Sequence, residues 1–274
     1  MARILTARVL IFFTAVAIVA GCRPPRPVIR FAPVGTEVTR LRTDYSLSEL
    51  ERRALTPENV KTLTQDEVDQ IYTRLSSGAM PDGPFRGDLF FPRDRSGRAS
   101  VRDLPDPAPR LLAHASTLKA ERLGRALWKG KVFFRAQGIL RNRIDELAIL
   151  RPIIPDAKSI PKLTFDGDTT WLLFPAKLSC GESRLDPTRR SIVIDYSKGS
   201  EVEGYREVPD KLAGPEGLNI RDEVRIVRPG FYLGRAYFGD RFALNFTLVD
   251  PAVTGTSAPA NLQEDCDGVR VERN

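Results

Sequence analysis

The spacing of hydrophobic positions changes near residue 128, which divides the chain into a helical part and a β-rich part. Before this point, apolar residues recur three and four positions apart, the period of one helix face. After it, short runs of β-branched and aromatic residues are separated by glycine, proline and aspartate, as in strands joined by turns. We therefore expect an α+β fold, in which short N-terminal helices in a helical and loop-rich region over 45–127 pack on a β-rich domain over 128–252.

Residues 46–76 are expected to form two or three short helices that share one apolar side. Thr56 and Pro57 suit a helix start, with a capping side chain followed by proline at the first helical position. Thr64 and Glu67 have the spacing of a capping box. The apolar side of the helix that follows comprises Val68, Ile71, Tyr72 and Leu75.

A turn-rich segment and a loop separate these helices from the next amphipathic pattern. Residues 77–94 contain the sequence Pro-Asp-Gly-Pro, which is strong turn chemistry. Residues 92–109 are polar and rich in proline, as expected of a surface loop. An amphipathic helix is then predicted over 108–127.

The β-rich part is predicted to be one antiparallel sheet that is strongly curved or barrel-like. The runs with strand composition are 127–134, 162–174, 189–197, 222–227, 231–238 and 241–249. Asp166-Gly167 and Gly239-Asp240 are candidate hairpin turns. In the last run apolar residues alternate with small and polar ones, which predicts a strand buried on one face only. A polar C-terminal tail over 253–274 follows.

The N-terminus has the three parts of a secretory signal peptide, expected over 1–21. Arg3 and Arg8 precede an apolar run over 9–20, and small residues then lead to Cys22. This run is shorter than the roughly 20 residues that a membrane-spanning helix needs. It is therefore expected to be removed rather than to span a membrane.

The sequence Val-Ala-Gly-Cys at the end of this run resembles the lipobox of bacterial lipoproteins. The resemblance implies that Cys22 becomes the first mature residue and carries a diacylglyceryl group, with fatty acids such as palmitate. Two or more acyl chains give stable attachment, where a single chain is only marginal. Residues 22–44 would then be the lipidated cysteine and a tether. The residue after Cys22 is Arg23 and not aspartate, and by similarity to the sorting of bacterial lipoproteins this implies the periplasmic side of the outer membrane. The alternative to lipidation is ordinary signal-peptide cleavage, with Cys22 as an incidental cysteine.

Composition and charge narrow the classes of function. The chain has 274 residues, of which 42% are hydrophobic, enough for one large domain with a buried core. The formal net charge is +7, but acidic residues are interleaved with the basic ones. A nucleic-acid-binding protein concentrates its basic residues in a patch, so we expect no nucleic-acid partner. A membrane partner is expected through the lipid anchor, aided by a modest attraction to anionic head groups.

The cysteines favour one disulfide bond. If Cys22 carries lipid, Cys180 and Cys266 remain as an even number in an oxidising compartment, where pairing is expected. Such a bond would attach the polar tail to the β-rich domain. Two unpaired buried thiols are the alternative, and a catalytic role for Cys180 would require that its thiol be free.

The sequence contains no recognisable catalytic or metal-binding pattern. His114 is the one histidine, which leaves too few ligands for a histidine-based metal site. There is no G-x-S-x-G nucleophile motif and no glycine-rich phosphate loop. We therefore predict no catalytic residues, no metal and no cofactor, and keep an enzyme that uses Asp, Arg, Lys and Tyr groups as an alternative.

Charged residues within the apolar strands, with one neighbouring tryptophan, are the candidate ligand-binding residues. They are Trp128, Lys129, Lys131, Asp195, Arg225 and Arg235. An unpaired buried carboxylate is costly, so an inward-facing Asp195 should pair with an arginine. Together these groups would form a polar cluster at the base of a cavity and orient a ligand head group. Structural ion pairs, or side chains that simply face solvent, are the alternative.

Trp128, placed just before an antiparallel meander, resembles the arrangement in lipocalin-like (calycin) barrels over about 125–250. Ala126 stands where lipocalins usually have glycine. The segments 81–87, 127–131 and 222–234 also resemble local signatures of a family of bacterial envelope proteins. The barrel resemblance implies a protein that binds a hydrophobic or amphipathic small molecule without turnover.

Three functions can therefore be compared for a lipid-anchored envelope protein. A closed cavity would favour a small-molecule carrier. A cleft with converging, strongly perturbed ionisable groups would favour an enzyme acting on lipids or small molecules. A filled core with an exposed apolar patch would favour a structural or assembly lipoprotein that holds a protein partner.

Overall fold

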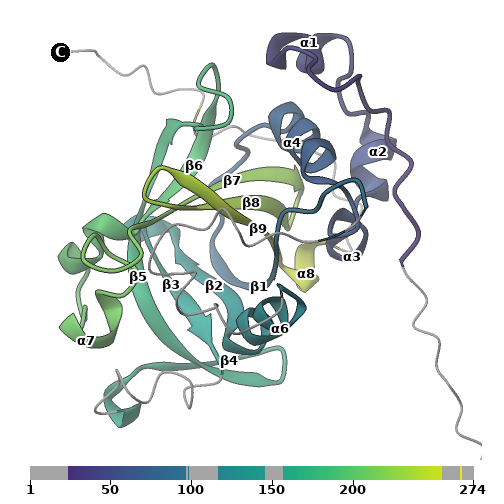
Figure 1. Cartoon of the computed structure of the whole chain (residues 1–274). Coiled ribbons are helices and arrows are strands. Elements are labelled where there is room, and N and C mark those ends of the chain that lie inside the picture. Colours follow the sequence, from purple (N-terminus) through teal and green to yellow (C-terminus); the bar gives the residue numbers. More distant parts are fainter. Residues whose placement is uncertain (1–23, 97, 99–116, 146–156, 255–265, 267–274) are drawn as a thin grey trace, which may run out of the picture.

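The computed structural model describes residues 24–96, 98, 117–145, 157–254 and 266. An antiparallel β-barrel carries a layer of short helices on one side (Figure 1). Eight strands close the barrel in the order β1, β2, β3, β5, β6, β7, β8, β9 and back to β1. The expected α+β class with a barrel-like sheet is confirmed, and the barrel is consistent with the resemblance to lipocalin-like proteins.

The strands are longer than most of the helices. The strands are β1 (Gly83–Phe90), β2 (Trp128–Phe134), β3 (Ile139–Ile144), β4 (Lys162–Phe165), β5 (Asp168–Glu182), β6 (Arg190–Asp195), β7 (Ile220–Arg228), β8 (Phe231–Phe238) and β9 (Arg241–Val249). The α-helices are α1 (Val38–Thr43), α2 (Glu49–Ala54), α3 (Pro57–Val60), α4 (Gln65–Arg74), α6 (Thr117–Leu127), α7 (Glu207–Asp210) and α8 (Pro251–Thr254). Short 3-10 helices are η1 (Arg135–Gln137), η3 (Ala157–Ser159) and η4 (Tyr196–Glu201). Within the described ranges, no helix has the length and apolar character needed to cross a bilayer.

The barrel closes through a strand that the sequence pattern did not predict. β1 lies in the segment 77–94, which we expected to be rich in turns, and it pairs with β2 on one edge and β9 on the other. Its residues Phe85 and Leu89 belong to the buried core inside the barrel. The region expected to be helical and loop-rich therefore also supplies a barrel strand. The Pro-Asp-Gly-Pro sequence overlaps the start of this strand, and its turn residues hid the alternation of apolar and polar positions in β1.

β3 was also missed, because its sequence places polar and charged residues in the middle of a short strand. It pairs with β2 and with β5, and the second pairing completes the ring. Arg143 of β3 is nevertheless only 1% exposed. Its guanidinium donates hydrogen bonds to Thr170 Oγ1 and to the backbone carbonyl of Phe85, both at 3.3 Å.

Both predicted hairpin turns are confirmed. β4 joins the start of β5 through Asp166 and Gly167, which both have positive φ angles, 57° and 84°. β8 joins β9 through Gly239 and Asp240, and Phe238 pairs with Arg241. Such two-residue connections match the natural twist of antiparallel strands.

Apolar side chains from all eight barrel strands fill the interior. The buried members include Phe85, Phe133, Leu140, Ala176, Ile192, Val224, Tyr232 and Phe246. Phe85 lies edge-on to Phe133 and to Tyr232, with ring centroids 5.4 and 5.7 Å apart. Such edge-to-face contacts are favourable beyond the area that they bury. The barrel interior is therefore a packed core.

A second apolar core lies between the helices and the outer surface of the barrel. It combines helical residues such as Leu55, Ile71 and Leu75 with Phe231 and Leu233 of β8. Figure 1 shows the helices α1 to α4 gathered at one side of the barrel. The barrel wall on this side is consequently buried on both faces.

The helix starts follow the local signals in the sequence. The side chain of Thr56 accepts a hydrogen bond from the backbone N–H of Asn59, and Pro57 is the first residue of α3. Thr64 and Glu67 form the predicted capping box of α4. The predicted apolar side of α4 is buried, at Val68, Ile71, Tyr72 and Leu75. α6 lies within the helix expected over 108–127, of which residues 108–116 are outside the described ranges.

The helical layer changes the environment of β9. Phe246 and Leu248 belong to the barrel core, as the alternation predicted. Asn245, on the other face, is 0% exposed, and its Nδ2 donates to Oε1 of Gln65 in α4 at 2.7 Å. The expectation that this strand is buried on one face only is therefore wrong, because α4 covers the second face.

Residues 28–44, which belong to the segment 22–44 expected to hold the lipidated cysteine and a tether, pack on the helices. The backbone N–H of Ala32 donates to Oε1 of Gln70 at 2.9 Å, and Nε2 of Gln70 donates back to the Ala32 carbonyl at 3.1 Å. α1 follows, and its Leu41 is 5% exposed. The segment packs on the helices because it carries apolar groups and satisfies its backbone there. Cys22 lies outside the described residues.

A disulfide joins Cys180 of β5 to Cys266, with the two Cα atoms 5.2 Å apart. This is the pairing expected from the cysteine count. Cys266 is fully buried among the residues of the barrel core, and its carbonyl accepts a hydrogen bond from Nη1 of Arg190 at 3.2 Å. One point of the C-terminal tail is thereby attached covalently to the barrel.

Candidate functional site

One polar cluster lies inside the barrel, centred on the ammonium group of Lys131. Its Nζ donates hydrogen bonds to Oδ2 of Asp222 at 2.8 Å, to Oδ1 of Asn142 at 2.9 Å and to the hydroxyl of Tyr196 at 2.5 Å. The indole Nε1 of Trp128 donates to the same Asn142 oxygen at 2.9 Å. Lys131 and Asp222 are only 2% and 3% exposed. We call these five residues the Lys131 cluster.

Strand register brings the members of the Lys131 cluster together. β2 and β3 place Lys131 directly opposite Asn142. Asp222 lies in β7 two residues before Val224, so both side chains point into the barrel. Tyr196 follows the end of β6 as the first residue of η4. The cluster therefore depends on closure of the barrel, since its members come from β2, β3, β7 and the start of η4.

Two glycines make room for the aromatic rings that flank Lys131. Its Nζ lies 5.4 Å from the ring centroid of Trp128 and 5.3 Å from that of Phe246. A Cβ atom at Gly87 would lie 2.4 Å from the Trp128 ring, and one at Gly234 would lie 2.2 Å from the Phe246 ring. The glycines thus allow cation–π contacts that add to the ion pair.

Burial determines the protonation states in the cluster. Loss of solvation lowers the pKa of Lys131, and the carboxylate of Asp222 opposes this shift. Burial, together with the nearby Asp222, raises the pKa of Tyr196 well above its ordinary value. Tyr196 therefore stays neutral, with its hydroxyl 3.2 Å from Oδ2 of Asp222. Because an ammonium group has three donors and all three are used here, a ligand would have to displace one of these partners.

The structure brings two of the candidate ligand-binding residues together, Trp128 and Lys131. Arg225 instead lies on the outer face of the barrel, under α4. Its Nε donates to Oγ of Ser191 at 3.0 Å, and its Nη1 donates to the backbone carbonyl of Tyr72 at 3.1 Å. These bonds connect the helical layer to the barrel wall.

Arg235, like Arg225, lies on the outer face of the barrel under α4. It forms an ion pair with Asp69 of α4, and its Nε donates to the hydroxyl of Tyr237 at 3.1 Å. Its guanidinium carbon lies 4.0 Å from the ring centroid of Phe242. In the described structure both arginines join the two layers of the fold.

Lys129 and Asp195 lie apart from the Lys131 cluster. Nζ of Lys129 is 3.5 Å from Oδ2 of Asp145 in a partly exposed ion pair. Among the described residues no arginine forms an ion pair with Asp195, whose Oδ1 accepts hydrogen bonds from the N–H and the hydroxyl of Ser197, at 2.9 and 2.6 Å. Asp195 therefore caps the start of η4.

The candidate ligand-binding residues did not include three members of the cluster, Asn142, Asp222 and Tyr196, although Tyr196 was a candidate group, with Asp195, for the alternative enzyme. The sequence did contain a signal for Asp222. It lies two and four positions before Val224 and Ile226, so its side chain points to the same face of β7 as these two residues of the barrel core. A polar residue at a core position of a strand needs a buried partner. Asn142 could not be found in this way, because β3 itself was not predicted.

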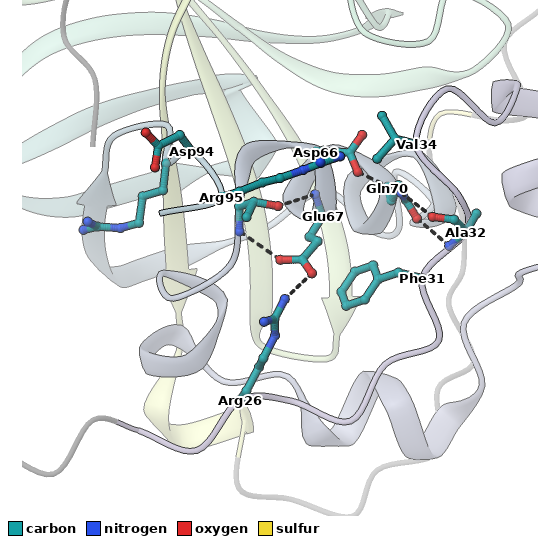
Figure 2. Close-up of a pocket in the computed structure, with 11 residues that line it drawn as sticks. Arg26, Phe31, Ala32, Val34, Asp66, Glu67, Gln70, Asp94 and Arg95 are labelled. Atoms are coloured by element: carbon teal, nitrogen blue, oxygen red, sulfur yellow. Dashed lines mark hydrogen bonds and ion pairs between the residues drawn. The ribbon is translucent and has the colours of Figure 1, made fainter. Parts of the chain in front are cut away.

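A groove on the outside of the helical layer is the second candidate site (Figure 2). Its volume is about 540 Å³, and it lies between the N-terminal segment, α4 and the chain that follows β1. Its charged lining includes Arg26, Arg93, Arg95, Asp66, Glu67 and Asp94, and its apolar lining includes Phe31, Ala32 and Val34. The groove is therefore amphipathic.

Some of the charged groups in the groove are fixed, while others remain exposed. Figure 2 shows Arg26 directed toward Glu67, with which it forms an ion pair. Arg93 is held by Glu121, with Nη2 to Oε2 at 3.0 Å. Arg95 is exposed, and within the described part of the chain it forms no ion pair.

No protein-family profile, curated protein or solved structure matches this chain. Among the described residues, no group of three or more His, Cys, Asp or Glu side chains could hold a metal ion. The two sites differ in their geometry. The Lys131 cluster is sealed within the barrel core, whereas the groove is open to a ligand from solvent.

Proposed function

We propose that this protein is a lipid-anchored protein of the bacterial cell envelope that binds an amphipathic small molecule in the groove. The observation that carries the binding proposal is the groove itself, with a volume of about 540 Å³ and with apolar and charged walls. Small-molecule sites typically have volumes of about 300–1,000 Å³. A β-barrel protein is compatible with small-molecule binding. We expected the binding site inside the barrel, but apolar side chains fill its interior. We therefore place the proposed site in the groove.

The location proposed for the protein comes from the N-terminal sequence. The apolar run over 9–20 and the lipobox-like residues before Cys22 support export and lipidation. The sorting resemblance at Arg23 supports the periplasmic side of the outer membrane. The basic excess in the chain supports contact with a membrane surface rather than with nucleic acid.

A Cys22→Ser variant is expected to lose its acyl mass and its membrane association. Serine removes the thiol that would carry the diacylglyceryl group, and the acyl chains provide the stable attachment. Intact mass spectrometry of the protein, with membrane fractionation of the producing cells, measures both effects. A cleaved wild-type protein without acyl mass would contradict the proposed anchor.

A Val34→Trp variant is expected to lose most of the ligand that copurifies with the wild-type protein. Val34 lines the groove and is 64% exposed, so the larger ring fills the groove without entering the protein core. Native mass spectrometry and lipid extraction, on protein purified from its own membrane, measure the ligand. Val208→Trp is the matched control, because Val208 is also exposed, at 40%, but does not line the groove. Equal ligand occupancy in both variants would exclude the groove as the site.

A second function, as a structural or assembly lipoprotein, is favoured by one specific observation. The barrel interior is a packed core, and the N-terminal segment and α2 carry the exposed apolar residues Val28 and Leu50, at 87% and 79% exposure. Apolar residues that form a contiguous exposed patch can hold a protein partner. Native mass spectra that show a stable second protein and no small molecule would support this function over ligand binding.

A further inference from the structure

We infer that the groove and the surface around it dock on the phospholipid bilayer, with a zwitterionic phospholipid headgroup as the occupant of the groove. This inference rests on the proposed function, because it names the class of amphipathic molecule and its source. It also changes the role of the N-terminal segment, which would lay the helical layer on the bilayer rather than hold the protein away from it.

The length of chain between the attachment point and the groove restricts where the groove can lie. Arg26 lines the groove and is four residues after Cys22. A fully extended chain spans at most about 3.6 Å per residue, so these two Cα atoms are separated by no more than roughly 14 Å. The headgroup layer on one side of a bilayer is about 5–8 Å thick, so the chain can place Arg26 at most a few ångströms beyond it. If Cys22 is acylated, the Arg26 end of the groove therefore lies at or close to the headgroups.

The N-terminal segment and α2 carry exposed apolar residues, of which Val34 also lines the groove. Val28, Val34 and Leu50 are 87%, 64% and 79% exposed, the highest exposures among the large hydrophobic residues of the described ranges. Figure 1 shows the N-terminal segment and α2 along the outer edge of the molecule, with the barrel on their other side. All three residues are in this part of the fold, and a bilayer offers apolar groups a place just beneath the headgroups.

The charges in the groove match a headgroup that carries both signs. Arg95 can contact a phosphate, for which a guanidinium group is well suited. Arg26, whose side chain is 62% exposed in its ion pair with Glu67, can do so with its remaining N–H donors. Asp66 is exposed in the same groove and can contact an ammonium group. A purely anionic headgroup would offer no partner to the exposed carboxylate of Asp66, and it would compete with Glu67 for Arg26. Phosphatidylethanolamine has the required phosphate and ammonium groups.

The test is photo-crosslinking of the full-length protein, purified from its own membrane, to vesicles that contain a headgroup-labelled photoactivatable phospholipid. Separate vesicles are made of phosphatidylethanolamine with phosphatidylcholine, and of phosphatidylglycerol with phosphatidylcholine. Peptide mapping by mass spectrometry locates the adducts. We expect adducts within 26–34, 64–70 and 93–95, and more of them from phosphatidylethanolamine than from phosphatidylglycerol.

A charge-neutral pair of substitutions tests the headgroup contacts. Arg95→Gln combined with Asp66→Asn is expected to lower the adduct yield from phosphatidylethanolamine about tenfold or more, because it removes hydrogen bonds to charged groups and one such bond contributes roughly that factor. The matched control is Arg241→Gln with Asp240→Asn, because both residues are exposed at the turn between β8 and β9 and do not line the groove. The control is expected to match the wild-type yield.

The outcomes separate this inference from the proposed function. Adducts confined to the barrel strands, equal yields from both lipids, or an unchanged yield in the Arg95 and Asp66 variant would each overturn the inference. If a different small molecule copurifies with the wild-type protein and is lost in Val34→Trp, the proposed function is supported although the headgroup inference is wrong. If neither a small molecule nor a headgroup is found, both are wrong.

Discussion

An Asp222→Asn variant is expected to lose about 3–5 kcal/mol of its free energy of unfolding, because it leaves the buried ammonium group of Lys131 without its charged partner. The distance between Nζ and Oδ2 is 2.8 Å, and neither residue is more than 3% exposed. Asn142 and Tyr196 would remain as neutral acceptors, which compensate only in part. Equilibrium unfolding in urea or guanidinium chloride, followed by tryptophan fluorescence, measures the loss.

A double variant separates the cost of an unpaired charge from the value of the pair. Lys131→Met with Asp222→Leu removes both charges, and such replacements are often neutral or stabilising. We therefore expect it to be more stable than Asp222→Asn alone. Asp240→Asn is the control, because Asp240 is 99% exposed in its ion pair with Arg184 and should change stability little. If Asp222→Asn alone were as stable as the wild type, this would contradict the described ion pair between Lys131 and Asp222.

Loss of the disulfide between Cys180 and Cys266 is expected to cost about 4–5 kcal/mol in the chain-entropy model. The bond closes a loop with a sequence separation of 86, so breaking it gives the unfolded chain much more freedom. Unfolding curves of the wild type with and without a reductant, and of a variant with alanine at both positions, measure the effect.

The alanine variant also provides the control for the disulfide experiment. Its unfolding midpoint should not respond to reductant, and it should equal that of the reduced wild type. Thiol titration of the unfolded protein counts the free cysteines independently. Free thiols at both Cys180 and Cys266 before reduction, with no change in the unfolding midpoint on reduction, would contradict the bond.

The two candidate sites have different physical roles in this fold. The Lys131 cluster is closed, with each donor of the ammonium group used by the protein, and it connects separate strands at the centre of the barrel. Polar groups of this kind can specify one arrangement of strands, because a shifted register would leave buried charges unpaired. The groove has the opposite character, since Arg95 and Asp66 are exposed there and available to a ligand.

Short-range features of the fold were predictable because neighbouring residues determine them. The capping box of Thr64 and Glu67 and the hairpin turn of Asp166 and Gly167 form as the sequence indicates. These features involve hydrogen bonds and backbone angles within a few residues, so the surroundings change them little. The same reasoning predicted the antiparallel sheet from Trp128 onward, since strand alternation is also a local pattern.

Long-range features were not predictable from periodicity, and the candidate ligand residues illustrate the reason. Lys131, Arg225 and Arg235 all interrupt apolar strands, yet Lys131 points into the barrel and the two arginines lie under α4. The position of a residue within a strand determines on which of the two faces its side chain lies. It does not determine which of these faces α4 covers. The sequence likewise indicated that buried charges need partners, without indicating that the partner of Lys131 is Asp222.

The helix starts, the tight turns and most of the strands of this protein follow from its amino-acid sequence alone. Three features emerge only when the chain is folded: β1 and β3 complete the barrel, α4 buries the outer face of β9, and residues between Arg26 and Val34 line a groove. The physical reason is the range of the interactions. Local elements depend on neighbours in the chain, whereas closure, burial and the groove depend on contacts between segments far apart in the sequence.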